Sequence, residues 1–148
     1  MIHEENCTYE VAKLAKEKGF DEKVYHYYQI INKHYRECQD RIEPYIFSFK
    51  LETDDCFTRY NKASEDVISA PTQSLLQRWL REERGIQIYI DSDLDFDDET
   101  FVYEWQIANK ENFDNGGFEI HRYNSEESHS TYELALEDAL KYALENLV

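Results

Sequence analysis

The sequence is poor in glycine and proline, and it carries none of the common catalytic motifs. Only 4 of its 148 residues are glycine and 2 are proline, so it has little of the glycine-rich backbone that cradles phosphate groups. The patterns G-x-S-x-G and H-E-x-x-H, the P-loop and the dinucleotide glycine motif are all missing. The sequence therefore predicts a protein that is not an enzyme and needs no cofactor.

Cysteine pairs and long apolar runs are missing as well. The three cysteines, an odd number without C-x-x-C spacing, are Cys7, Cys38 and Cys56, and they indicate reduced thiols in a cytosolic protein. The opening residues MIHEENC lack the basic and apolar regions of a signal peptide. No apolar run approaches the length that spans a membrane. We therefore expect a cytoplasmic location and no membrane partner.

Basic residues are scarce, since 16 Lys and Arg stand against 32 Asp and Glu, for a net charge of −16. Such a surface repels nucleic-acid backbones and anionic membranes. It is compatible with a basic protein partner or a divalent cation, although solubility alone is the simplest explanation. A hydrophobic content of 41% with 15% aromatic residues favours a folded core over disorder, and the length predicts one domain over residues 1–148.

The clearest predicted element is a helix within residues 69–85. Its apolar stripe at helical spacing consists of Leu75, Leu76, Trp79 and Leu80. Pro71 is tolerated only in a first turn, so the helix begins near Pro71 or Thr72. Gly85 suits a left-handed helix end. A helix this short is marginal alone, so its stripe must pack against another element.

The residues after Gly85 predict a three-stranded antiparallel meander and a closing helix. Alternation puts Ile86, Ile88 and Ile90 on one strand face, and it predicts a buried row on a second strand made of Phe101, Tyr103, Trp105 and Ile107. An acidic connection over residues 91–100 joins these two strands. Residues 114–117 predict a tight turn into a third strand with Phe118 and Ile120.

The last predicted helix begins with a capping box of Ser130 and Glu133. Its continuous apolar stripe consists of Tyr132, Leu136, Ala139, Leu140, Ala143 and Leu147. Helix, meander and helix over residues 69–148 is also the order of double-stranded-RNA-binding domains. Such domains need a basic start to this helix, whereas here it begins Tyr132-Glu133, so we expect no direct nucleic-acid binding.

The N-terminal part, residues 1–68, predicts a helix over residues 8–18 that ends at Gly19. Residues 23–38 are rich in β-branched and aromatic side chains, which favours a hairpin turning at Asn32 and Lys33, although a buried helix stays open. Pro44 should break what precedes it, and residues 45–51 alternate as a strand. Residues 52–69 predict a long loop. The fold class is thus α+β, with an N-terminal helix and β-rich segment before the C-terminal unit.

The residues SAPTQ at 69–73 and QRWLRE at 77–82 resemble a motif of small uncharacterised proteins from gut anaerobes, their prophages and their phages. The stretches LAKEKGF at 14–20 and STYELAL at 130–136 resemble two further segments of that family in the same order. The resemblance implies a phage or mobile-element origin and an intracellular location, and it supplies no catalytic residue. We expect the motif to be a requirement of folding and not a site.

Two groups of charged residues are candidate sites. Calcium-loop spacing at positions one, three, five, seven and twelve is matched by Asp93, Asp95, Asp97, Glu99 and Glu104. Asp98 replaces the turn glycine of such loops, and a solvated hairpin connection is the alternative. Along the helix predicted within residues 69–85, Arg78, Arg81 and Arg84 are a candidate contact edge for an acidic partner, and a solvated face of mixed charge is the alternative.

Three functional hypotheses follow. The first is a non-enzymatic protein-interaction module, since tyrosine is abundant and suits contact surfaces, and the net charge is compatible with a basic protein partner. The second is a DNA mimic whose carboxylates imitate phosphates and occupy a nucleic-acid enzyme. The third is a divalent-cation-binding protein that uses residues 91–99. A structural component of a virion or other assembly is a further possibility.

Overall fold

The computed structural model describes residues 4–33, 41–48, 61 and 67–148, and its contacts divide the chain into two compact units. One unit, which we call the C-terminal unit, joins Glu4 and Glu5 to Gln73–Val148, and the other, the N-terminal unit, is Asn6–Thr72. The fold is α+β, with two antiparallel sheets and three helices among the described residues. The boundary lies four residues beyond the one expected after residue 68, and the single domain remains a prediction.

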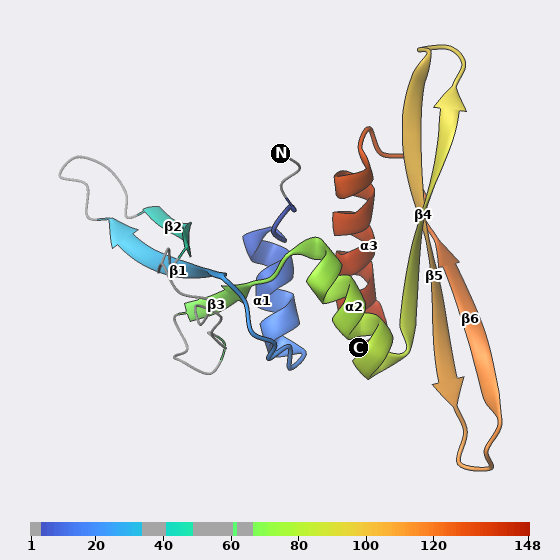
Figure 1. Ribbon diagram of the computed structural model, residues 1–148, viewed down its shortest axis with the longest axis horizontal. Coiled ribbons are helices and arrows are strands. Elements are labelled where there is room, and N and C mark those ends of the chain that lie inside the picture. Colours follow the sequence, from blue (N-terminus) through green and yellow to red (C-terminus); the bar gives the residue numbers. More distant parts are fainter. Residues whose placement is uncertain (1–3, 34–40, 49–60, 62–66) are drawn as a thin grey trace. The chain divides into compact units, whose positions relative to one another are not determined.

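The C-terminal unit is a three-stranded meander with two helices on one face (Figure 1). In chain order its elements are α2 (Gln73–Arg84), β4 (Ile86–Asp95), β5 (Thr100–Asn112), β6 (Phe118–Asn124) and α3 (Tyr132–Asn146). β5 is central and antiparallel to both neighbours. The predicted order of helix, three strands and helix is therefore confirmed.

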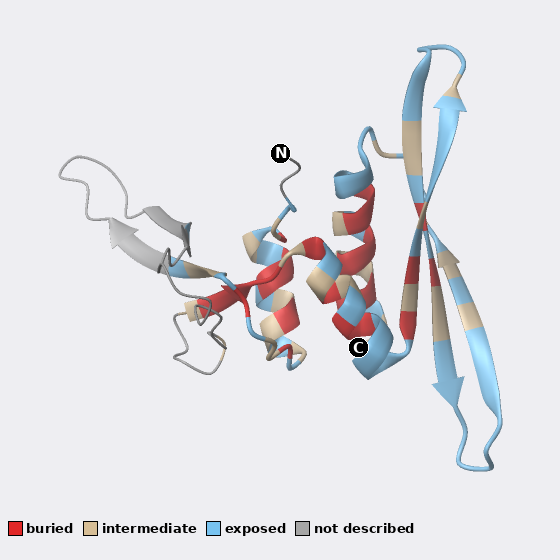
Figure 2. Cartoon of the chain, viewed as in Figure 1, coloured by how far each residue is buried: buried red, intermediate tan, exposed pale blue. Residues whose placement is uncertain are grey.

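The core of this unit lies between the two helices and the middle of the sheet, as the buried residues of Figure 2 show. Ile88 lies opposite Ile107, and Ile90 lies opposite Trp105. Ile88, Ile107 and Trp105 are buried, and so are the side chains that α2 and α3 turn towards them, which include Leu76, Trp79, Leu80, Leu136, Leu140 and Leu144. Burying a large apolar side chain contributes about 1.5–3 kcal/mol, so this layer stabilises the unit.

The ends of α2 follow the sequence signals closely. The helix begins at Gln73, whose N–H donates to the Glu5 carbonyl at 2.9 Å. It ends before Gly85, which has a φ of 70°, a conformation that glycine adopts without strain. Two glutamines then tie α2 to its neighbours, since Gln73 Nε2 donates to Glu137 Oε2 at 2.8 Å and Gln77 Nε2 to the Ile88 carbonyl at 3.1 Å.

The cap of α3 differs from the predicted one. The N-cap is Thr131, whose Oγ1 accepts a hydrogen bond from the Leu134 N–H at 3.2 Å, and not Ser130. Serine and threonine can each cap a helix through a side-chain hydroxyl. The sequence Ser-Thr therefore does not fix which of the two is the N-cap.

The strands of the C-terminal unit run further than its helices. The acidic segment predicted as a connection continues β4 as far as Asp95, and only residues 96–99 turn. The buried row predicted on β5 is therefore half wrong, because Trp105 and Ile107 are buried whereas Phe101 is 62% exposed. Phe118 and Ile120 of β6 are exposed as well. The turn at residues 114–117 is confirmed, with Gly116 at a φ of 83°.

The N-terminal unit begins with α1 (Tyr9–Glu17), which confirms the predicted helix. Its end is a Schellman motif, in which the Phe20 N–H donates to the Ala15 carbonyl at 2.9 Å and the Gly19 N–H to the Lys16 carbonyl at 3.1 Å. Phe20 is 1% exposed, so the motif carries an aromatic ring into the core of this unit.

The sheet of the N-terminal unit has the order β2-β1-β3, from β1 (His26–Lys33), β2 (Arg41–Ser48) and β3 (Val67–Ala70). The hairpin turn predicted at Asn32 and Lys33 is wrong, because β1 runs through both residues and pairs with β2. Pro44 does not break the chain but lies within β2, an edge strand, where a missing N–H is tolerated. Residues 67–69, expected in a loop, belong to β3, while the rest of that loop, except Asn61, lies outside the described residues.

Two polar residues of the SAPTQ segment, Ser69 and Gln73, are buried and hydrogen-bonded. Ser69 is 0% exposed, and its N–H donates to Asn61 Oδ1 at 2.8 Å. Asn61 Nδ2 in turn donates to the Phe20 carbonyl at 2.7 Å. Gln73 is 6% exposed and bonded within the C-terminal unit. These residues serve the packing of their own units, as a folding role requires.

A pair of leucines on α3 tests the assignment of the core. We expect Leu140→Ala, at a site that is 0% exposed, to lower the free energy of unfolding by about 2–5 kcal/mol. Leu134→Ala, at a site that is 52% exposed on the same helix, should change it by no more than about 0.5 kcal/mol. Urea denaturation followed by tryptophan fluorescence measures both, since both tryptophans lie in this unit. Equal effects would contradict the assignment.

A second pair tests which residue caps α3. Thr131→Ala should destabilise the protein by about 1 kcal/mol, because the first turn loses a hydrogen-bond acceptor. Ser130→Ala should have an effect below about 0.5 kcal/mol. The same denaturation experiment decides between them, and the reverse ranking would show that the predicted capping box forms after all.

Candidate interaction surface

The β4–β5 hairpin projects beyond the helices as an arm with two unlike faces, which we call the acidic arm (residues 91–104). Leu94 and Phe101 lie opposite each other in the ladder and continue the buried row outward. They are 38% and 62% exposed, and Phe96 in the turn is 82% exposed. The other face carries the alternate residues Asp91, Asp93, Asp95 and Glu104, together with Thr100 and Val102. The arm is therefore apolar on one face and acidic on the other.

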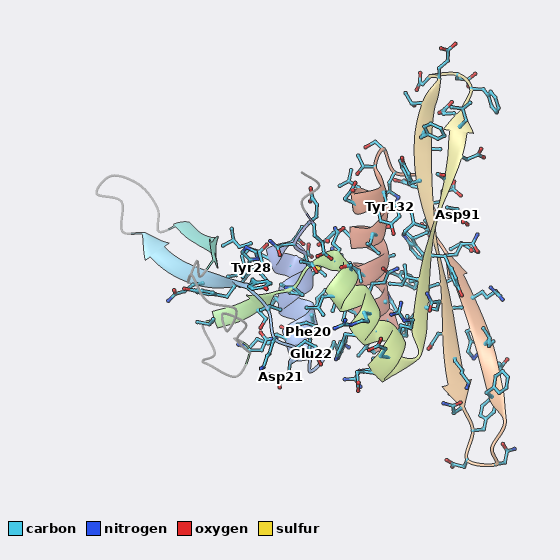
Figure 3. All side chains as sticks on the ribbon, viewed as in Figure 1. Phe20, Asp21, Glu22, Tyr28, Asp91 and Tyr132 are labelled. Atoms are coloured by element: carbon cyan, nitrogen blue, oxygen red, sulfur yellow. The ribbon has the colours of Figure 1, made fainter. Side chains whose placement is uncertain are left out.

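The apolar face of the arm is uncovered because α3 does not extend along the hairpin as far as the arm. Tyr132, the first residue of α3, contacts the Tyr103 ring edge-on at 6.4 Å between centroids. Figure 3 labels Tyr132 there, and Asp91 where the arm leaves the part of the sheet beside the helices. Figure 1 shows the end of the β4–β5 hairpin extending past α3 with no helix beside it. The arm thus exposes the side chains that the core would otherwise bury.

The five residues with calcium-loop spacing lie in this arm but do not form a calcium loop. Asp93 and Asp95 belong to β4, Asp97 and Glu99 to the turn, and Glu104 to β5. Asp93 Oδ1 accepts from the next N–H and Asp95 Oδ1 from the Asp97 N–H. Within the described parts of the chain, no three His, Cys, Asp or Glu side chains are placed to hold a metal ion. The extended strand separates the carboxylates that a calcium loop would bring together.

A second arm, which we call the β5–β6 arm (residues 110–120), extends from the opposite end of the meander (Figure 1). Its exposed apolar residues are Phe113, Phe118 and Ile120. The Lys110 ammonium lies 4.9 Å from the Phe118 ring centroid and covers part of it. His121 Nε2 lies 3.3 Å from Glu111 Oε2 and 3.8 Å from Glu119 Oε2. This arm has its own cation, Lys110, and the His121 imidazole lies beside two of its carboxylates, so it is less suited to a basic partner.

The three arginines of the predicted contact edge are exposed on α2. Arg78 Nε lies 4.0 Å and Arg81 Nη2 3.5 Å from the carboxylate of Glu82, and the Arg84 guanidinium lies 5.0 Å from the Trp79 ring centroid. Glu82 partly neutralises the edge, and exposed pairs of this kind contribute little to stability. The arginines remain available for contact, but they form a weaker candidate than the acidic arm.

A cavity of about 440 Å³ lies between β5, β6, the loop after β6 and α3. Three aromatic rings line it, namely Trp105, Tyr123 and Tyr142. The Trp105 Nε1–H donates to Asp138 Oδ2 at 2.7 Å, and His129 Nε2 lies 3.3 Å from the same oxygen. The wall of the cavity is thus ordered, because a hydrogen bond to the Asp138 carboxylate fixes the Trp105 indole.

Neither the exposed phenylalanines nor the cavity is predicted by the sequence analysis. Phe96 between aspartates was a usable signal, because an aromatic residue inside a carboxylate run is not needed for solubility. Asp138 and Tyr142 stand four residues apart on α3 and so share a helix face, but nothing local indicates that this face meets Trp105.

Comparison of the chain with protein-family models, with curated proteins and with solved structures finds no match to any of them. The resemblance to phage and prophage proteins therefore stays a prediction. Among the described residues, no helix is both long and apolar enough to cross a membrane.

The hydrogen bond between Trp105 and Asp138 makes a testable contribution to stability. Asp138→Ala leaves the indole N–H of a residue that is 3% exposed without its acceptor. We expect a loss of about 1–2 kcal/mol in the free energy of unfolding, reduced by water at the half-exposed carboxylate. Glu145→Ala, on the exposed side of the same helix, is the matched control. Denaturation curves that coincide for the two variants would contradict this role.

Proposed function

We propose that the protein is a non-enzymatic interaction module that binds a basic protein partner through the acidic arm. The observation that supports this most directly is the 82% exposure of Phe96, the highest among the large apolar side chains of the described residues. Soluble proteins seldom expose contiguous apolar surface that is not used for binding, and aromatic residues are enriched at the centres of protein interfaces.

The charges of the arm support a basic partner. Its acidic face carries Asp91, Asp93, Asp95 and Glu104, and the turn adds Asp97, Asp98 and Glu99. Complementary charge steers encounter and selects partners. Burial of Phe96 and Phe101 on binding then contributes about 1.5–3 kcal/mol each. The arm therefore combines long-range attraction with an apolar anchor.

The cytoplasmic location and the phage or mobile-element origin belong to the same proposal. They rest on the resemblance of the segments around residues 14–20, 69–82 and 130–136.

The DNA mimic is a second candidate, supported by one feature of the same arm. Asp91, Asp93 and Asp95 form a row on one strand face, with neighbours about 6.7 Å apart from the rise of a strand. A regular row of negative charge is the feature through which nucleic-acid enzymes recognise a phosphate backbone. Under this candidate the partner is such an enzyme, and duplex DNA displaces it from the arm.

Photo-cross-linking in cells that carry the gene tests the proposal. A benzophenone analogue of phenylalanine replaces Phe96 in one variant and Leu134, an exposed residue of α3, in the other. We expect a defined adduct with one basic protein from position 96 and none from position 134. The adduct should disappear when Asp93, Asp95 and Asp97 are changed to Asn, because steering and complementarity are lost.

Binding measured with the purified adduct partner completes the test. Phe96→Ala/Phe101→Ala should weaken binding by at least about 2 kcal/mol, the usual threshold for a hot spot. Phe113→Ala/Phe118→Ala, on the β5–β6 arm, should bind as the native protein does. Equal loss in both variants, an adduct of twice the chain mass, or no adduct at position 96 would each overturn the proposal.

A further inference from the structure

The cavity beside α3 has an aromatic wall that is held in place by its neighbours. The Tyr142 ring centroid lies 5.0 Å from that of Trp105 and 5.7 Å from that of Tyr123. Trp105 is 3% exposed and its indole is bonded to Asp138. The rings of one helix and two strands therefore meet in a fixed arrangement, and Tyr123 and Tyr142 are half-exposed at the opening.

The part of the cavity lining that comes from the loop after β6 is acidic, and the ends of this loop are fixed. Glu126 and Glu127 line the cavity from the loop after β6. Both ends of that loop are bonded to β5, since the Ser125 N–H donates to the Trp105 carbonyl at 2.9 Å and the His129 N–H to the Tyr103 carbonyl at 2.7 Å. The two glutamates are thus held between two anchored points instead of moving with a free loop.

The polar groups of the cavity are suited to receive hydrogen bonds. With Asp138, three carboxylates line it, and no Lys or Arg is among the described residues that do so. His129 Nε2 faces Asp138, and its Nδ1 is buried with no hydrogen-bond partner among the described residues. A ligand with N–H donors or a diffuse positive charge fits this environment, whereas an anion does not.

We propose that this cavity binds an organic cation, an alkylammonium or a guanidinium group. The faces of Trp and Tyr attract such cations, and carboxylates at the rim add charge-assisted hydrogen bonds. A metal ion does not fit, because it requires several oxygens converging on one point and the described residues form no such group. A volume of about 440 Å³ lies within the range of small-molecule pockets. This site is separate from the acidic arm and does not depend on the function proposed for it.

The cation has two possible sources, a free small molecule or the side chain of Arg or Lys in another protein, and one titration distinguishes them. The probes are butylguanidinium, butyltrimethylammonium and the capped tripeptide acetyl-Gly-Arg-Gly-amide. Butylurea, which has the shape of butylguanidinium without its charge, is the neutral control. Tighter binding of the tripeptide than of the free cations indicates a protein side chain, and the reverse order indicates a small molecule.

Nuclear magnetic resonance of the indole N–H groups supplies the readout. The chain has 2 tryptophans, so Trp105 reports on the cavity and Trp79 serves as the internal reference. We expect a saturable shift of the Trp105 signal with at least one cation and no comparable shift of Trp79. Glu126→Gln/Glu127→Gln should weaken the affinity about fivefold to tenfold, as expected for two exposed charge pairs, and Tyr142→Leu should weaken it as well.

A matched charge control makes the result specific. Glu111→Gln/Glu119→Gln removes the same number of charges from the β5–β6 arm, and its affinity for the cation should equal that of the native protein. The proposal is overturned if butylurea binds as tightly as butylguanidinium, if both indoles shift alike without saturation, or if the two double variants lose affinity equally. Two indole signals that stay separated from each other and from the random-coil position confirm that each variant is folded.

Discussion

The structure of the C-terminal unit depends on the packing of two helix stripes against one short stretch of sheet. Leu76 and Leu80 of α2 and Leu140 of α3 are buried over the pair Ile88 and Ile107. This contact covers only the middle of strands that continue well past it at both ends. The two helices therefore cover only part of the sheet, and the strand residues beyond them are exposed.

That constraint explains where the surfaces of interest lie. The acidic arm is an extension of the core strands, so its apolar face repeats the core pattern without a helix over it, and its other face is free to carry carboxylates. The cavity lies beside the same helix, where Asp138 and Tyr142 of α3 contact Trp105 and the loop after β6 supplies further lining residues. The position of α3 on the sheet thus leaves one aromatic surface exposed and partly encloses an aromatic pocket.

Much of the fold is predictable from the sequence, because helix ends and strand alternation are local. Gly19 and Gly85 follow helix ends with a positive φ, which glycine adopts without strain. The spacing of the isoleucines identifies β4. Apart from the cap of α3, which moved by one residue, the errors named here depend on long-range contacts. Whether Asn32 and Lys33 turn or continue depends on the partner strand, Pro44 is acceptable only because β2 is an edge, and the exposure of Phe101 depends on where α3 begins. The candidate site could not be recognised without knowledge of these long-range contacts. Residue spacing alone suggested a calcium loop where the structure has an extended hairpin.

Amide hydrogen exchange in the free protein tests most directly whether the acidic arm is a preformed hairpin. The Lys110 N–H donates to the Gly85 carbonyl, so alternation points the amides of Val102 and Glu104 towards β4, opposite Asp93 and Asp91. The Phe101 amide points away from β4. We expect slower exchange at Val102 and Glu104 than at Phe101. Exchange at Val102 and Glu104 as fast as that of Phe101 would contradict it, because the arm would then have no ladder to present its aromatic side chains.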